Sequence, residues 1–151
     1  EKDANQERIA VIEGVGFATE PIQHNTSLSA NADCLRKSMK MALKNAQLTR
    51  VDSIVMHAPG TLRGDESEIK AVKNLFSDNI PHLISTKHLS GHTFGASGAL
   101  SLELAILMLQ KQQSVFLPYP SVGGKNLNKL DHIMVNSTGF GGNAVSIILS
   151  K

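Results

Sequence analysis

Two histidines and a lysine follow short apolar segments of the chain and stand close to glycines. His57 comes directly after the apolar segment Ser53–Met56, whereas Lys87 and His92 come after the apolar pair Leu83–Ile84. A neutral imidazole can donate an N–H to an oxygen that becomes negative, and an ammonium group supplies positive charge. These residue types therefore indicate an enzyme site that polarises a carbonyl group.

Three motifs follow one another along the chain, in the segments His57–Glu68, Ser85–Gly98 and Asn136–Gly142. The first contains His-x-x-x-Thr and Gly-Asp-x-x-Glu. The second contains Ser-Thr-Lys, Gly-His and Gly-Ala-x-Gly, and the third is rich in glycine and carries a phenylalanine. Together they resemble the motifs of the β-ketoacyl-(acyl carrier protein) synthases, or ketosynthases, of the thiolase superfamily. The resemblance covers nearly the whole chain but only the C-terminal half of such an enzyme.

The resemblance implies a role for each matched residue. His57 and His92 would hydrogen-bond the thioester carbonyl of a malonyl group, and Lys87 would lie in the site with Glu68 as its partner. As CO₂ leaves, the enolate oxygen gains charge that preorganised donors stabilise. A phenylalanine at position 140 would gate the acyl pocket. The residues that bind substrate would be Thr61, Phe140, Gly139 and Gly141.

Plainer interpretations of the same residues remain open. Asp65 and Glu68 also fit a capping box in which Asp65 is the N-cap of a helix, and this needs no catalysis. Lys87 could be a solvated loop charge, and His57 a core-edge histidine bonded to backbone. Four histidines have no motif support and are interpreted as loop or surface groups: His24, His82, His88 and His132.

The chain departs from the ketosynthase pattern at three points. Ala58-Pro59 stands where the family has Gly-Thr, so one hydroxyl that would contact the pantetheine arm is absent. Thr138 replaces a second phenylalanine, and Asn143 directly follows Gly142 where the family interposes a threonine. These changes bear on substrate recognition but leave both histidines and the lysine in place.

The chain contains a single cysteine, Cys34, at the edge of an apolar stripe made by Leu35, Met39 and Leu43. No glycine elbow surrounds it, so we interpret it as an inert structural residue. Ketosynthases carry the acyl group on a cysteine in their N-terminal half, and the resemblance implies that this half is a partner of the chain. Because the sequence starts at Glu1 without methionine or signal peptide, we expect an excised domain, a proteolytic product or a split subunit that is inactive alone.

Composition excludes several classes of protein. The 151 residues are 41% hydrophobic and 19% charged with a net charge of +2, which argues against disorder and against nucleic-acid binding. No apolar run is long enough to span a membrane, and no CxxC or HExxH spacing indicates a metal. We expect no metal and no cofactor, since phosphopantetheine is carried by the substrate's carrier protein, and one cysteine suits a reducing cytoplasm.

The pattern of apolar residues predicts an α/β fold in the order β-α-β-α-β-α-β-β. The predicted strands are 9–17, 53–56, 83–84, 133–137 and 144–149, and the predicted helices are 33–46, 65–76 and 99–109. The third helix is apolar on nearly all sides and is expected to be buried, and the last two strands are expected to form a hairpin at or near the sheet edge. The resemblance implies one half of the thiolase fold over residues 9–151, after a flexible stretch at 1–8.

Two further functions were weighed against the ketosynthase. A chain-length-factor-like subunit would be a non-catalytic partner that shapes the acyl tunnel, but it has no chemical need for His57, Lys87 and His92 together. A thiolase-like enzyme would act on coenzyme A esters. For a ketosynthase the resemblance implies an acyl carrier protein as partner and a homodimer or heterodimer in fatty-acid or polyketide synthesis.

Overall fold

The computed structural model describes residues 8–21, 28–115, 127 and 129–151. Its strands are β1 (Val11–Thr19), β2 (Ser53–Val55), β3 (His82–Ile84), β4 (His132–Gly139) and β5 (Asn143–Ser150). Its helices are α1 (Asp33–Asn45), α2 (Leu62–Phe76), α3 (Lys87–Ser90) and α4 (Ser97–Lys111), with a 3₁₀ turn η1 (Phe94–Ala96) before α4. The predicted order of strands and long helices is confirmed, and α3 and η1 are additions. The expected flexible stretch at 1–8 lies outside the described residues except for its last position.

All five strands form one sheet in the order β1-β5-β4-β2-β3. Strand β2 is parallel to β3 and β4, whereas β5 is antiparallel to β4 and β1. The predicted hairpin exists, and of the two expected places, at or near the sheet edge, it does not take the first: β5 lies next to the edge strand β1, and β4 is the central strand. The apolar pattern predicts that β4 and β5 pair with each other, whereas the strands that flank the pair come from distant parts of the chain.

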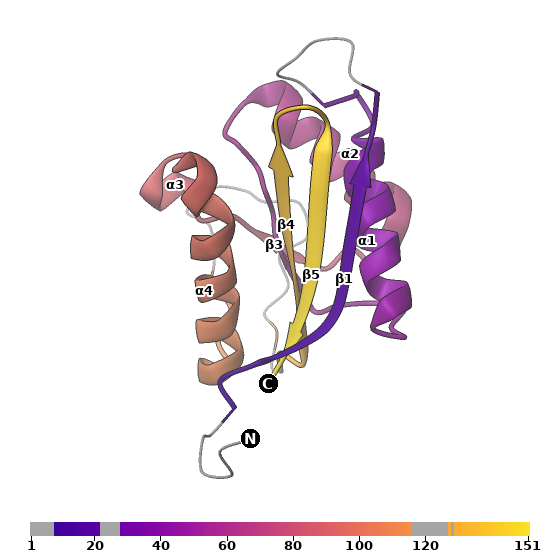
Figure 1. Cartoon of the computed structure of the whole chain (residues 1–151). Helices are drawn as coiled ribbons and strands as arrows, with labels where there is room; N and C mark the ends of the chain where they lie inside the picture. The colour runs from indigo at the N-terminus through magenta and orange to yellow at the C-terminus, as the bar shows by residue number, and fades with distance from the viewer. Residues whose placement is uncertain (1–7, 22–27, 116–126, 128) are drawn as a thin grey trace, which may run out of the picture.

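Helices cover the two faces of the sheet unequally. Figure 1 shows α4 on one face and α1 with α2 on the other. Adjacent residues of β2 point to opposite faces: Ile54 packs with Leu35 and Met39 of α1, and Val55 packs with Met108 of α4. The fold is therefore layered, with two separate apolar cores on either side of one sheet.

Two glycines allow α1 to lie very close to β1. A Cβ atom at Gly16 would collide with the carbonyl oxygen of Ser38 and would lie 2.6 Å from the nitrogen of Ala42. A Cβ at Gly14 would meet the backbone of Ala42 and Ala46 in the same way. Glycine is required here because the helix backbone fills the space where a side chain would project.

The apolar composition of α4 predicts a helix that is buried on nearly all sides, and this prediction is wrong. Its buried residues are Ser97, Ser101, Ala105, Met108 and Leu109. On its other side Leu107 is 44% exposed, and on the same face of the sheet Phe17 is 67% exposed and Val15 and Val145 are each 38% exposed. Phe17 pairs directly with Val145 across β1 and β5, so these two side chains share a face. We call Val15, Phe17 and Val145 the open face.

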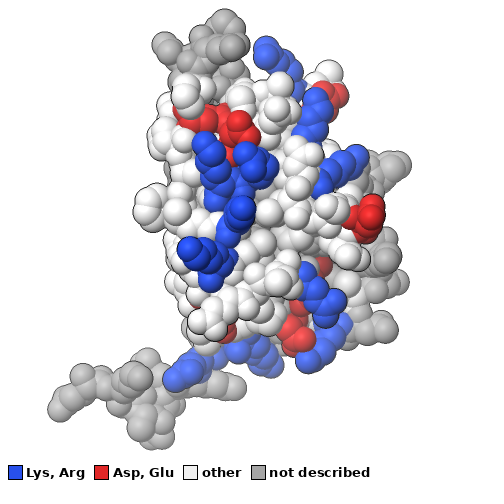
Figure 2. Space-filling view, turned by 90° about the vertical axis from the view of Figure 1, so that its right-hand side faces the viewer, with Lys and Arg blue, Asp and Glu red and all other residues white. Residues whose placement is uncertain are grey.

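The surface over α1 has a different character. Lys37, Lys40 and Lys44 are exposed along this helix, and Figure 2 shows Lys and Arg side chains gathered on this side of the molecule. Long charged side chains on an outer helix face are ordinary solvent contacts. In the described ranges, none of the helices is long and apolar enough to cross a membrane.

Candidate active site

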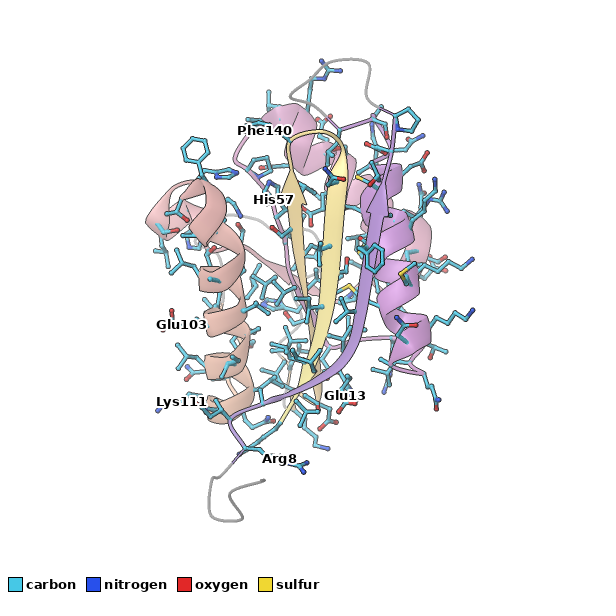
Figure 3. All side chains as sticks on the ribbon, in the orientation of Figure 1. Arg8, Glu13, His57, Glu103, Lys111 and Phe140 are labelled. Atoms are coloured by element: carbon cyan, nitrogen blue, oxygen red, sulfur yellow. The ribbon has the colours of Figure 1, made fainter. Side chains whose placement is uncertain are left out.

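The candidate site lies where the parallel strands end. His57 follows β2, and Figure 3 shows it at the same end of the sheet as Phe140, which lies at the tip of the β4–β5 hairpin. A cavity of about 1110 Å³ is lined by His57, His92 and Phe140, among other residues. The carboxyl ends of parallel strands are where ligand sites gather in α/β folds, so the position fits the predicted chemistry.

His57 is held by a backbone donor from the neighbouring strand. The Thr138 N–H donates to Nδ1 of His57 at 3.3 Å, and the imidazole is only 6% exposed. Because Nδ1 accepts, the proton of the neutral ring is on Nε2. Burial is the main cause that lowers the pKa of His57 to about 4, and the charges of Lys87 and His92 contribute to this shift in the same direction. The ring is therefore a neutral donor near pH 7.

His92 is oriented by the same device. The Phe94 N–H donates to Nδ1 of His92 at 3.1 Å, and the Ser97 hydroxyl lies 3.4 Å from that nitrogen. The two imidazole centroids are 5.3 Å apart, with the rings at 76° to each other. Both rings thus use Nδ1 as an acceptor, which leaves Nε2–H of each ring as the available donor in its neutral form.

Lys87 is the first residue of α3 and is buried, with 9% of its surface exposed. The interpretation of Lys87 as a solvated loop charge is therefore wrong. Burial lowers the pKa of the Lys87 ammonium, although the carboxylates of Glu68 and Asp65 act to raise it. Lys87 is not among the residues that line the cavity. Its charge acts on His57 through space.

Glu68 is buried and holds the loop that carries His57 through hydrogen bonds to its backbone. Its carboxylate accepts the N–H of His57 at 3.0 Å, the N–H of Ala58 at 2.8 Å and the Nδ2–H of Asn136 at 3.0 Å. Ala58 has a φ of 29°, an unusual backbone conformation for a residue with a side chain. Between described residues, no ion pair within 4.0 Å joins Glu68 to Lys87. The expected partnership with Lys87 is thus electrostatic, while the direct contacts of Glu68 are with backbone and amide.

The alternative interpretation of Asp65 and Glu68 as a capping box is wrong. Helix α2 starts at Leu62 with Thr61 as its N-cap, and Thr61 Oγ1 accepts the Gly64 N–H at 3.2 Å. Asp65 lies inside the first turn and accepts the Gly60 N–H at 3.1 Å. The sequence offered two residues that can cap a helix, and the earlier one begins it.

The four predicted substrate-binding residues all line the cavity. Phe140 is 72% exposed, and Gly141 beside it has a φ of 88°, which a residue with a side chain rarely adopts. Gly139 ends β4, and a Cβ there would meet nothing within 4 Å. The Thr61 hydroxyl accepts the Gly64 N–H in the cap of α2, and this bond does not use its own O–H donor.

Sequence reasoning missed several residues of the site. Leu62 is 84% exposed and Phe94 is 74% exposed, and both line the cavity together with Arg63. The available signal was the occurrence of large apolar residues inside otherwise polar, glycine-rich motifs. Asn136, which holds Glu68, was also missed, because its partner lies 68 residues away in the sequence.

Cys34 lies away from the cavity and is fully buried. Burial raises the pKa of its thiol to about 12, and the nearby charge of Glu20 acts in the same direction. A thiol in this state is a poor nucleophile. The described residues contain no group of three or more His, Cys, Asp or Glu side chains that could hold a metal ion.

The remaining histidines are less alike than expected. His82 is only 3% exposed and its Nε2 lies 2.8 Å from the carbonyl oxygen of Val115, so its interpretation as a loop or surface group is wrong. His88 is half-buried and bonds the Ser85 carbonyl through Nδ1 at 2.8 Å. His132 begins β4, and His24 lies outside the described residues.

Comparison with known proteins gives a consistent result. Residues 9–117 match the family described as "Beta-ketoacyl synthase, C-terminal domain". The 3-oxoacyl-[acyl-carrier-protein] synthase 1 of Buchnera aphidicola subsp. Baizongia pistaciae is 34% identical over 91% of this chain and 36% of its own length. The 3-oxoacyl-[acyl-carrier-protein] synthase 2 of Coxiella burnetii is 31% identical over 99% of this chain and 40% of its own length. The chain thus spans well under half of these curated relatives.

Solved structures agree with the sequence relatives. A β-ketoacyl synthase from Burkholderia phymatum has a TM-score of 0.79 at 27% identity, over 95% of this chain and 38% of that one. A ketosynthase in complex with its chain length factor from Xenorhabdus doucetiae has a TM-score of 0.81 at 28% identity, over 96% of this chain and 40% of the matched chain. The fold of the chain is therefore the thiolase-like fold of these structures.

Proposed function

The chain belongs to the β-ketoacyl synthase family, as its C-terminal domain, and from this premise we propose that it supplies the decarboxylation site of a β-ketoacyl-(acyl carrier protein) synthase. The whole enzyme would join an acyl thioester to malonyl carried by an acyl carrier protein. The proposal assigns His57 and His92 to the reacting carbonyl, and Lys87 and Glu68 to the support of these histidines.

The proposed step begins with the malonyl thioester in the cavity. Its C–COO⁻ bond breaks, CO₂ leaves, and the electron pair of that bond forms an enolate whose oxygen accepts Nε2–H from His57 and from His92. The enolate carbon then attacks the acyl thioester, a C–C bond forms, and the thiolate of the acylated cysteine leaves. Each donor to the developing charge contributes a few kcal/mol in sites of this kind.

One observation carries this proposal: both imidazoles present the same nitrogen. Each Nδ1 accepts a backbone N–H, from Thr138 for His57 and from Phe94 for His92. Such bonds fix the ring and its tautomer without using the nitrogen that would face a substrate. A merely structural pair would more simply use both ring nitrogens within the protein.

The acyl group would be held by a cysteine outside this chain. Cys34 does not suit the role, because it is fully buried and its thiol pKa is raised to about 12. We therefore place the nucleophile in an N-terminal half of the ketosynthase, and we expect the chain alone to condense nothing. The reducing cytoplasm suits a chain whose one cysteine is a buried free thiol.

The open face supports a partner that packs against α4. Val15, Phe17 and Val145 expose apolar side chains on the α4 face of the sheet, and Val145 also lines the cavity. Exposed apolar patches of this kind mark interfaces. We assign this face to the N-terminal half of the ketosynthase, in an enzyme that is a homodimer or heterodimer. The acyl carrier protein would then deliver its thioester to the mouth of the cavity.

The test is malonyl decarboxylation by the complete enzyme. We expect His57→Ala and His92→Ala each to slow CO₂ release from malonyl-carrier protein by about a hundredfold, because each removes a donor to the enolate oxygen. Transfer of the acyl group to the cysteine of the other half should change much less. Wild-type decarboxylation rates in both variants would overturn the assignment.

A chain-length-factor-like subunit is the second candidate. It is favoured by the similarity to a structure that contains a ketosynthase and its chain length factor, and by Ala58-Pro59 in the first motif. Such a subunit would leave decarboxylation unchanged when His57 or His92 is replaced in it, and would instead alter product length. The same assay therefore separates the two functions.

A further inference from the structure

A chain of buried polar groups crosses the core between α1 and the loop that carries His57. Ser38 on α1, Ser146 on β5, Asn136 on β4 and Glu68 on α2 are each at most 1% exposed. Ser38 Oγ lies 2.8 Å from Ser146 Oγ, and the Ser146 hydroxyl donates to Asn136 Oδ1 at 2.8 Å. Asn136 Nδ2 then donates to Glu68 Oε1 at 3.0 Å. Four elements thus share one unbroken hydrogen-bonded path.

The protons along this path have a single order. The amide oxygen of Asn136 can only accept, so the proton of Ser146 goes to Asn136. Ser38 is then the donor in its contact with Ser146, and it shares that proton with the Leu35 carbonyl at 3.0 Å. The path is polarised from α1 towards the Glu68 carboxyl, and it fixes which end of the Asn136 amide faces Glu68.

Among the described residues, each hydrogen-bond partner of the Glu68 carboxyl is a donor. The N–H groups of His57 and Ala58 and the amide of Asn136 all donate to it. A protonated carboxyl would direct an O–H at these donors and would find no acceptor in this set. The arrangement is satisfied only by the carboxylate anion.

We propose that Ser38, Ser146 and Asn136 are positioning residues that keep Glu68 ionised and thereby fix the backbone of His57 and Ala58. Loss of the anion would weaken the hydrogen bonds from both backbone N–H groups. The left-handed conformation of Ala58 would then no longer be held in place. The histidine would then lose the anchor that sets its ring in the cavity. The effect on catalysis rests on the proposed function, whereas the ionisation of Glu68 does not.

Several charges act on Glu68 besides this path. The pKa of Glu68 is raised above its ordinary value because the group is buried, and its three hydrogen bonds and the positive charge of Lys87 oppose this rise. Asp65 acts on Lys87 from α2, and the charges of Lys87 and His92 act on His57. Lys87 stays unchanged in the variants below, so a change in the pKa of Glu68 reports the hydrogen-bonded path.

The direct test is an NMR titration of the side-chain carboxyl of Glu68 in the full chain with ¹³C-labelled glutamate. We expect Asn136→Leu, which keeps the size but removes the donor, to raise the pKa of Glu68 by about one unit or more. Ser146→Ala and Ser38→Ala should raise it by progressively smaller amounts. These two serine variants are read by themselves if Asn136→Leu does not fold.

Ser53→Ala is the matched control, because Ser53 is equally buried but donates to the His82 carbonyl outside the path. It should leave the pKa of Glu68 unchanged. In the complete enzyme, the acid side of the pH profile for decarboxylation should move upward in Ser146→Ala and stay in place in Ser53→Ala. An unchanged pKa of Glu68 in Ser146→Ala and Ser38→Ala would overturn the proposal, whether or not the enzyme decarboxylates malonyl groups.

Discussion

The two faces of the sheet differ in how completely the helices of the chain cover them. On the α1 and α2 face, an apolar core encloses a satisfied polar path and the outer surface carries lysines. On the α4 face, the core around Met108 and Leu109 gives way to the open face with its exposed Phe17 and Val145. The α1 and α2 face holds the hydrogen-bonded residues that reach Glu68, whereas the α4 face is the one we propose to be covered by the N-terminal half of the ketosynthase. Four predictions test this difference, and they are given from the largest expected effect to the smallest.

The face that α1 and α2 cover should tolerate no extra volume between β1 and α1. We expect Gly16→Ala to lower the free energy of unfolding by about 3 kcal/mol or more, because the new methyl group meets the Ser38 carbonyl and not a flexible side chain. Urea denaturation measures this. Gly95→Ala is the control, since a Cβ at Gly95 meets nothing within 4 Å. Equal stability of the two variants would show that the backbone of α1 does not lie this close to Gly16.

The open face should matter for assembly and not for folding. We expect Phe17→Lys to weaken binding of the chain to an N-terminal ketosynthase half about a hundredfold, because a charge would replace an aromatic anchor. Its free energy of unfolding should change by less than about 1 kcal/mol. Met41→Lys, on the α1 face with 38% exposure, serves as the control and should bind normally. Sedimentation of mixed halves gives the affinities, and equal losses in both variants would refute the distinction between the faces.

Buried His57 should make stability depend on pH. Its pKa is lowered from 6.5 to about 4, so the unfolded chain binds more protons than the folded chain between these values. The free energy of unfolding should therefore fall by about 2 kcal/mol from this residue alone between pH 7.5 and pH 5, with no further loss below the folded pKa.

His57→Gln isolates that contribution. Comparison of urea denaturation curves at both pH values, for wild type and variant, should show the loss in the wild type and its absence in the variant. Identical pH dependence in the two proteins would mean that His57 is not desolvated in the folded chain.

Phe140 gives the smallest expected effect. Gly139 and Gly141 carry no side chains, and a Cβ at Gly139 would meet nothing within 4 Å, so the turn can change its backbone angles and move the ring over the cavity. In the complete enzyme we expect Phe140→Ala to raise the ratio of uncoupled decarboxylation to condensation about threefold. Product analysis with labelled malonyl groups measures this ratio. No change in a stably folded variant would assign Phe140 a packing role only.

The same comparison separates what the sequence could predict from what it could not. The spacing of Leu35, Met39 and Leu43 predicted α1 to within one residue at its C-terminal end. Likewise, two alternating segments predicted the β4–β5 hairpin. These signals are local. The central position of β4, the start of α2 at Leu62 and the contacts of Glu68 depend on residues far apart in the chain, such as Asn136. The incomplete burial of α4 was not predicted, because the apolar composition of a helix does not say how much of its surface the rest of the chain covers.

The central claim is that Nδ1 of both His57 and His92 accepts a backbone N–H, so that the proton of each neutral ring is on Nε2. Long-range ¹H–¹⁵N NMR of the ¹⁵N-labelled chain at pH 7 reports the protonation of each ring nitrogen directly. The account predicts an unprotonated Nδ1 and a protonated Nε2 in both residues, because each Nδ1 accepts a backbone N–H. An imidazolium signal for His57, or a proton on Nδ1 of either ring, would contradict it.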